Sequence, residues 1–330
     1  MEKIKISLSK YTYEILTKDM ENFEIVKDNG ELNKNEFLNR LIINYTDTFS
    51  NESKEQIERI DAIIDRYVDL DEIDKINLSN ELVKSFRENM FFHDIDGTSV
   101  IVSVKPTKMS EPIITYLFDE VIQNQSISSY FREMFDSYAN LTQNTRERII
   151  FKDVFNELVK SIEKSKKVFV TLRNKDKTRI TASLYHLADS KDELFNYCLF
   201  QLPSGFLQTI RLSKIASVKI LNEPASFKDE NIPLLEFQAQ YCIQHPVGKN
   251  DFDEVKVHLT EVGKKLYKKI YLYRPNYIRS EGDDYYFLGS HDYIFNYFIR
   301  FGRHAIIQEP LYLKKKMEEF YLDSEKAYKK

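Results

Sequence analysis

The chain has 330 residues, of which 42% are hydrophobic and 30% are charged. This balance excludes a disordered chain and a coiled-coil rod, and the length suffices for about two or three domains. Only eight glycines occur, and no GxGxxG or GxxxxGK[ST] sequence is present. The glycine-rich phosphate loops of nucleotide enzymes are therefore not expected.

The chain contains two cysteines, Cys198 and Cys242, each among apolar residues and neither in a CxxC pair. Neither a disulfide scaffold nor a structural zinc site is expected from this pattern. The first residues, MEKIKISLSK, lack the apolar stretch of a secretion signal, and no run approaches the roughly 18 apolar residues of a membrane span. We therefore expect a cytoplasmic protein with no membrane partner.

The formal net charge of −4 conceals an uneven distribution. The first 165 residues are acidic throughout and residues 223–330 are balanced, whereas residues 166–222 hold ten basic and four acidic side chains. A strongly cationic segment in an acidic protein is typical of a site for phosphate or another anion. A solvated basic face is the alternative explanation.

The first 50 residues predict a strand followed by two helices. Residues 3–8 alternate polar and apolar side chains, as a strand with one apolar face does. Ser9 is placed to cap a first helix, and Asn33 with Glu36 forms a capping box that begins a second. A six-residue strand needs a partner strand, and none follows nearby, so we expect a second copy of the chain to provide it.

This order resembles a ribbon-helix-helix module, in which two chains pair their N-terminal strands and present outward side chains to a nucleic-acid groove. The resemblance implies that Lys3, Lys5 and Ser7 face the groove and that the backbone at Asn33 and Lys34 meets phosphate. A ribbon that dimerises without affinity for DNA is the alternative.

Residues 51–165 predict mainly amphipathic helices, because apolar residues recur there at spacings of three and four. A Val-Ile-Val-Ser-Val run at 100–104 predicts an isolated strand. His93-Asp94 resembles the metal-binding pair of phosphohydrolases, but the several further His and Asp ligands of that chemistry do not surround it. We therefore expect a structural role for this pair and no metal.

From residue 168 the apolar period changes to two. Strands are predicted at 168–172, from 179, at 194–202, at 207–212 and at 218–220, separated by polar turns. Several short strands within one segment predict a small, strongly bent β-barrel.

This segment resembles the WYL domain, a five-stranded Sm-like barrel. The family's Arg-Leu-x-Arg-Ile segment appears as Arg211-Leu212-Ser213-Lys214-Ile215, the Arg before its second strand corresponds to Arg179, and Tyr197 occupies the Tyr of the Trp-Tyr-Leu signature. The resemblance implies a domain that senses nucleic acid or nucleotide-like ligands through basic and aromatic side chains on one face.

The last third of the chain predicts the order β-α-β-β-α-β followed by a helix, which is the ferredoxin-like order. The sequence Phe298-Ile299-Arg300-Phe301-Gly302-Arg303, followed by Glu309-Pro310-Leu311, is similar to the C-terminal extension of many WYL domains. Eleven tyrosines lie between residues 267 and 328, and tyrosine favours interfaces. Together with the N-terminal strand, they lead us to expect a homodimer.

The predicted fold class is thus α+β with four parts. These are a ribbon-helix-helix-like module (1–50), a helical region (51–165), a WYL-like β-barrel (166–222) and a ferredoxin-like extension that dimerises (223–330).

No group of residues points to catalysis. The six histidines are scattered singly, and no nucleophile elbow or distinct set of carboxylates occurs. We expect no enzyme activity, no catalytic residue and no cofactor. The candidate nucleic-acid-binding residues of the barrel are Arg173, Lys175, Arg179, Tyr185, Tyr197, Arg211 and Lys214. Phe195 and Phe206 are expected in the barrel core.

Basic side chains interleaved with flat aromatic side chains suit single-stranded RNA better than a duplex, because stacking on an aromatic ring needs bases that have left the helix. The domain order resembles the WYL accessory proteins encoded beside type VI-D CRISPR systems, which implies a protein that binds single-stranded RNA and stimulates an RNA-guided ribonuclease effector. A transcription regulator whose ribbon binds duplex DNA and whose barrel senses a nucleotide or oligonucleotide is the alternative. A dimeric scaffold that recognises protein alone is a third.

Overall fold

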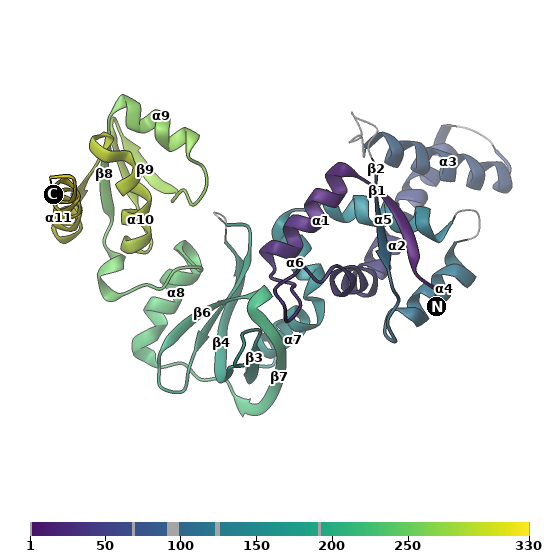
Figure 1. Cartoon of the computed structure of the whole chain (residues 1–330), viewed down its shortest axis with the longest axis horizontal. Helices are drawn as coiled ribbons and strands as arrows, with labels where there is room; N and C mark the ends of the chain where they lie inside the picture. The colour runs from purple at the N-terminus through teal and green to yellow at the C-terminus, as the bar shows by residue number, and fades with distance from the viewer. Residues whose placement is uncertain (1, 68–69, 91–98, 123–125, 191–192, 330) are drawn as a thin grey trace. The chain divides into compact units, whose positions relative to one another are not determined.

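The computed structural model describes residues 2–67, 70–90, 99–122, 126–190 and 193–329. The chain is α+β with three antiparallel sheets (Figure 1). It forms two compact units, unit 1 (Met1–Lys152) and unit 2 (Asp153–Lys330). None of the helices in the described ranges has both the length and the apolar character needed to cross a membrane.

The N-terminal strand finds its partner in the same chain. β1 (Ile4–Ser9) pairs antiparallel with β2 (Ser99–Val104). Ile6 and Leu8 are buried, while Lys5 on the opposite face is exposed. The prediction that a second copy of the chain supplies the partner of β1 is wrong, as is the prediction of an isolated strand at 100–104. Two strands about ninety residues apart in sequence satisfy each other's backbone groups and close one two-stranded sheet.

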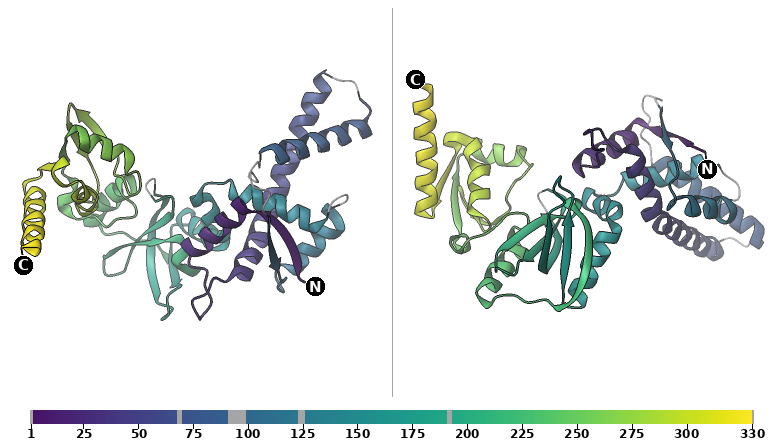
Figure 2. Two further views of the ribbon diagram at one scale, coloured as in Figure 1. Left: turned by 45° about the horizontal axis from the view of Figure 1, so that its top comes forward. Right: turned by 60° about the horizontal axis from the view of Figure 1, so that its bottom comes forward.

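Both predicted N-terminal helix starts are confirmed. Ser9 Oγ accepts a hydrogen bond of 3.1 Å from the backbone N of Thr12 at the start of α1 (Lys10–Asn22). Asn33 Oδ1 accepts from the backbone N of Glu36 at 3.3 Å, and its Nδ2 donates to Glu36 Oε2 at 2.8 Å, before α2 (Lys34–Tyr67). α2 continues through residue 50, where a module boundary was expected. Its second half and α3 (Glu72–Met90) form a hairpin that projects from the rest of unit 1 (Figure 2).

The core of unit 1 contains many aromatic rings and a buried polar network around Asp19. α4 (Glu111–Tyr116), the π-helical turn η1 (Leu117–Val121), α5 (Ile127–Ala139) and α6 (Gln143–Ile150) complete the unit. Arg146 of α6 donates through Nε and Nη2 to Asp19 of α1 at 2.6 and 3.0 Å, and the Tyr138 hydroxyl of α5 donates to the same carboxylate at 2.9 Å. Burial raises the pKa of Asp19, and the Arg146 guanidinium opposes this shift. Three helices are thereby fixed to one buried carboxylate.

Unit 2 begins within the first turn of α7 (Lys152–Glu163). It contains the five strands that the sequence predicted. Their order in one antiparallel sheet is β6-β5-β4-β3-β7. The bounds are β3 (Lys166–Leu172), β4 (Arg179–Asp189), β5 (Asn196–Gln201), β6 (Leu207–Arg211) and β7 (Ile215–Pro224). A short 3-10 turn, η2 (Leu212–Lys214), joins β6 to β7, which lie at opposite edges of the sheet.

The sequence did not predict the helix that covers part of this sheet. After the turn η3 (Asp229–Asn231), α8 (Ile232–Tyr241) packs Leu235 against Leu199 of β5, with Ile243 beside them. Tyr185 and Tyr197 are half-buried against the same small apolar cluster.

The C-terminal module, residues 249–329, has the predicted order of elements. These are η4 (Lys249–Phe252), β8 (Val255–Leu259), α9 (Glu261–Lys269), β9 (Tyr277–Glu281), β10 (Asp284–Phe287), α10 (His291–Phe298), η5 (Ile299–His304), β11 (Ala305–Glu309) and α11 (Leu311–Tyr328). The sheet order is β11-β8-β10-β9. Inward residues of β8, β10 and β11 form its core with α9, α10 and α11.

Candidate nucleic-acid interface

Some basic residues of the five-stranded sheet lie close together where β3 ends. Leu172, the last residue of β3, is opposite Ile215, the first residue of β7. The next residue, Arg173, donates from its backbone N to the carbonyl of Lys214 in η2 at 2.8 Å. The turn between β3 and β4 is therefore fixed beside η2, and basic residues from the two segments meet.

The turn between β3 and β4 exposes two lysines, Lys175 and Lys177. Asn174 Oδ1 accepts from the backbone N of Thr178 at 2.8 Å, and Asn174 Nδ2 donates to Thr178 Oγ1 at 2.7 Å. This pair of bonds closes the turn, in the manner of an Asx motif. Lys175 within the turn and Arg179 just after it are exposed, so both charges are available to an anion.

Two guanidinium groups converge on Ser213 in η2. Arg173 Nη1 donates to the Ser213 carbonyl at 2.9 Å, and Arg211 Nε donates to Ser213 Oγ at 2.9 Å. The Arg211 guanidinium also lies over the Phe195 ring, 4.1 Å from its centroid. A planar cation held on an aromatic face, with a second guanidinium anchored to the same residue, suits a phosphate next to a flat base. Arg173, Arg211, Ser213 and Phe195 are called the arginine site below.

The two candidate tyrosines differ in position. Tyr197 is opposite Arg211 in the β5–β6 register, and its hydroxyl donates to Glu193. Tyr185 instead packs edge-on against Phe227, with ring centroids 5.2 Å apart, and burial raises its pKa. Both tyrosines thus contact the apolar cluster under α8, but Tyr197 also lies beside the arginine site, whereas Tyr185 packs against Phe227.

Two expectations about phenylalanines need correction. Phe206, expected in the barrel core, is 65% exposed. It follows Gly205, whose φ of +91° belongs to the turn before β6, so the turn directs the ring away from the sheet. Phe195, also expected in the core, is only partly buried and supports Arg211. Sequence reasoning missed Ser213 as well, because its role depends on a backbone carbonyl and on η2.

A second cationic place lies in unit 1. A hollow of about 620 Å³ is lined by the residue before β1, the loop before α2, the start of α2, and the end of β2 with the residue after it. It includes four lysines, Lys3, Lys27, Lys34 and Lys105, and one carboxylate, Glu31, which pairs with Lys27 at 3.0 Å. Lys34 Nζ donates to the Tyr13 hydroxyl at 2.9 Å, which lowers the pKa of that phenol. Lys5 and Ser7 lie on β1 opposite Ser103 and Ile101. We call this place the lysine hollow.

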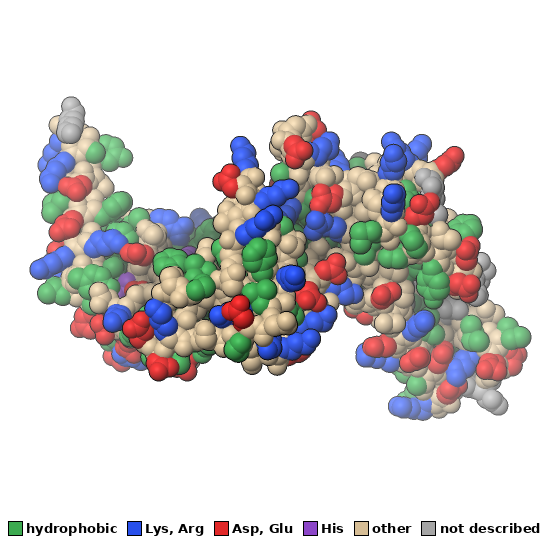
Figure 3. All heavy atoms as spheres, turned by 90° about the horizontal axis from the view of Figure 1, so that it is seen from below, with side chains coloured by type: hydrophobic (Ala, Val, Ile, Leu, Met, Phe, Trp, Pro, Cys, Tyr) green, Lys and Arg blue, Asp and Glu red, His purple; other side chains and the backbone are tan. Residues whose placement is uncertain are grey.

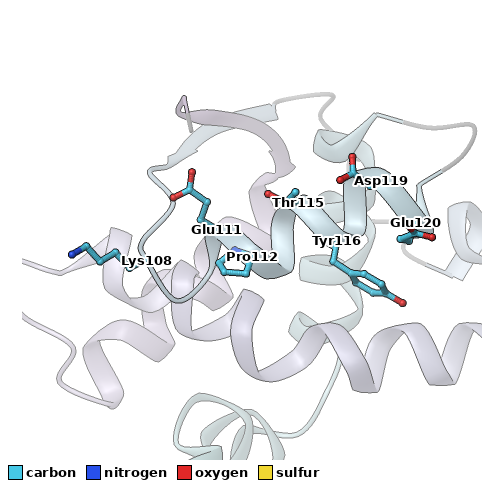
Figure 4. A pocket seen from close by; sticks show the side chains of 7 residues that line it. All are labelled: Lys108, Glu111, Pro112, Thr115, Tyr116, Asp119 and Glu120. Atoms are coloured by element: carbon cyan, nitrogen blue, oxygen red, sulfur yellow. The ribbon is translucent and has the colours of Figure 1, made fainter.

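Basic and acidic side chains are interspersed over most of the face drawn in Figure 3. A hollow of about 670 Å³ along α4 and η1 is lined by both signs of charge, and its side chains point in different directions, with Lys108 and Glu120 at opposite ends (Figure 4). It offers no converging set of groups. The hollow on α4 therefore lacks the converging cations of the arginine site.

Within the described ranges, no three side chains of His, Cys, Asp or Glu are grouped so that they could hold a metal ion. The His93-Asp94 pair lies outside the described residues. Cys198 and Cys242 are both buried and form no disulfide.

No protein-family model matches the sequence, and no curated protein matches it. A solved structure described as "Crystal structure of a CRISPR Cas-related protein" shares the fold, with a TM-score of 0.63 and 18% identity over 99% of this chain and 94% of that chain. Proteasome accessory factor B/C (PafBC) of Arthrobacter aurescens has a TM-score of 0.22 and 13% identity, over 68% of this chain and 36% of that chain. The second likeness is too slight to carry an argument.

Proposed function

We propose that this chain is a non-catalytic protein that binds single-stranded RNA through the arginine site. The observation that carries the proposal is the convergence of Arg173 and Arg211 on Ser213, with Arg211 stacked on Phe195. Guanidinium groups pair with phosphate, and the Phe195–Arg211 stack offers flat surfaces to an unpaired base. Lys175 and Arg179 extend the positive charge along the adjacent turn.

The finer fold interpretation belongs to this proposal. An Sm-like barrel of the WYL type is supported by five antiparallel strands whose two edge strands, β6 and β7, are joined by η2. The order β-α-β-β-α-β with sheet order β11-β8-β10-β9 supports a ferredoxin-like module. Exposed Tyr271, Tyr273 and Tyr277 on that module offer a surface for a second copy.

We further propose that RNA binding serves an RNA-guided ribonuclease effector of a CRISPR system. Support comes from the shared fold with a CRISPR Cas-related protein over 99% of this chain. In this role the protein supplies no catalytic group, and it increases RNA cleavage by delivering or holding the substrate strand. Adding it to such an effector should raise the cleavage rate, and Arg211→Ala should remove the gain.

Binding is tested by fluorescence anisotropy with single-stranded RNA, single-stranded DNA and duplex DNA of equal length. We expect the RNA to bind most tightly, and Arg211→Ala to weaken it about tenfold, because one stacked base and one phosphate contact are lost. The matched control is Arg303→Ala, an exposed arginine of the C-terminal module, which should leave the affinity unchanged. Equal weakening by both variants would show that total charge, and not the arginine site, decides binding.

A second candidate function is duplex DNA binding by the two-stranded sheet of unit 1, and the lysine hollow favours it. Its four lysines act as point charges toward phosphate. If this function holds, Lys3→Ala combined with Lys105→Ala weakens duplex binding about tenfold and leaves single-stranded RNA binding intact. Unchanged duplex affinity in this double variant, measured at two salt concentrations, would eliminate the candidate.

A further inference from the structure

Unit 2 contains a hollow between the C-terminal module and the part formed by the five-stranded sheet and α8. Its volume is about 510 Å³, within the range of small-molecule sites. One wall is formed by the end of β4 and the end of α8, and the other by the start of β9, the end of β10 and α10. The walls approach closely at Gly289, where an added Cβ would lie 3.7 Å from the Cys242 Cβ.

Amide and tyrosine side chains dominate this hollow. Gln240 on one wall and Asn276 on the other are both exposed, and neither side chain makes a hydrogen bond with another described residue. Tyr241 and Tyr277, likewise on opposite walls, are 37% and 47% exposed. Two amides and two aromatic rings thus face one space from two sides.

Cationic side chains are absent from the described lining of this hollow. None of its described lining residues is Lys or Arg, and Asp189 is the lining carboxylate. Behind Tyr293, another lining residue, the His245 ring is stacked at a centroid distance of 4.1 Å. Burial lowers the pKa of His245 to about 4, so this imidazole is neutral at physiological pH. A phosphate group would find no counter-charge among these residues.

We propose that this hollow binds an uncharged planar heterocycle of the nucleoside class. Gln and Asn amides donate and accept together, which matches the paired donor and acceptor on a base edge, as in their bidentate contacts with adenine. Tyrosine rings stack on bases that are free of a helix. The proposal does not depend on RNA binding at the arginine site, since the two sites share no residue.

Occupancy would join the sheet to the C-terminal module, because each wall supplies at least one amide and at least one tyrosine. A bound nucleoside therefore stabilises one arrangement of the two parts. The observable consequence is a rise in the melting temperature of unit 2 with ligand concentration.

Isothermal titration calorimetry with adenosine, guanosine, cytidine and uridine, and with their 5′-monophosphates, tests the proposal. We expect at least one nucleoside to bind, its monophosphate to bind no more tightly, and Gln240→Ala with Asn276→Ala to weaken binding about tenfold. Asn250→Ala, an exposed amide outside the hollow, is the matched control and should bind as the unmodified chain does.

Three results would overturn it. The first is no heat and no thermal shift with any nucleoside at about 1 mM, a concentration at which even weak sites are occupied. The second is tighter binding of the monophosphates. The third is binding that survives the double variant but is lost in Arg211→Ala, which would place the ligand at the arginine site.

Discussion

The two cationic places of this protein carry the same sign of charge with different chemistry. The lysine hollow of unit 1 has four ammonium groups on flexible stems and no aromatic ring among its lining residues. The arginine site of unit 2 has two guanidinium groups fixed on Ser213 and one of them stacked on Phe195. Lysines attract phosphate as point charges, whereas a held guanidinium also orients a planar group. The sign of the charge alone therefore does not show whether the lysine hollow or the arginine site binds a nucleic acid.

The internal contacts that stabilise unit 1 also differ from those that stabilise the C-terminal module of unit 2. Unit 1 fixes three helices to the buried carboxylate of Asp19 through Arg146 and Tyr138. The C-terminal module of unit 2 is held mainly by an apolar cluster in which Phe287 and Phe298 are fully buried. Removing one partner of a buried charge pair costs about 3–5 kcal/mol because a charge stays buried, and truncating a buried Phe costs a similar amount because a cavity remains. The two regions should accordingly be sensitive to different kinds of substitution.

The largest expected effect is on unit 1. Arg146→Ala leaves the Asp19 carboxylate buried without its cation, and we expect the free energy of unfolding of unit 1 to fall by about 3–5 kcal/mol. Urea denaturation of the full chain should then show an early transition for unit 1. The control is Arg59→Ala, whose side chain is 79% exposed. RNA binding that survives partial unfolding of unit 1 would place it in unit 2, and loss of RNA binding would contradict that assignment.

The local parts of the fold were predictable because each depends on neighbouring residues. β8 follows from strict alternation in Val255-Lys256-Val257-His258-Leu259, and the start of α2 follows from the capping box at Asn33. In both cases the pattern that selects the element is contained within a few residues. Periodicity and capping residues therefore located these elements without tertiary information.

The pairing of β1 with β2 could not be predicted in this way. The two strands lie far apart in sequence. Alternation of polar and apolar residues predicts a strand, but it does not show which other strand pairs with it. The arginine site was only partly predictable for a related reason. Charge and the segment around Arg211 pointed to it, but Ser213 contributes a carbonyl, and Tyr185 and Tyr197 are alike in sequence although only one lies near the arginines.

A smaller effect, on RNA affinity, distinguishes the contribution of the positive charge of Arg211 from that of its planar guanidinium group. Arg211→Lys keeps the positive charge and loses the flat guanidinium over Phe195 and the Nε bond to Ser213. We expect affinity for single-stranded RNA to fall about threefold to tenfold, with an unchanged salt dependence. Anisotropy titrations at several salt concentrations provide both quantities. Full affinity in the lysine variant would make this site equivalent to the lysine hollow and remove the contrast between them.

A last effect concerns pH and unit 2 alone. Burial lowers the pKa of His245 from 6.5 to about 4. Between these values the unfolded chain binds a proton that the folded chain does not, so stability falls as pH decreases from 6.5 toward 4. His245→Phe keeps a ring against Tyr293 and removes the titrating group.

The variant should therefore lose less stability than the unmodified chain over this interval, with urea midpoints measured at both ends. Acidic residues such as Asp284, whose pKa is lowered by hydrogen bonds from Lys256 and His258, titrate in both proteins, so the difference between the two profiles isolates His245. Parallel profiles would mean that this imidazole takes up its proton in the folded chain. The wall behind Tyr293 would then carry positive charge, and the lysine hollow and the arginine site would no longer be the two cationic places to compare.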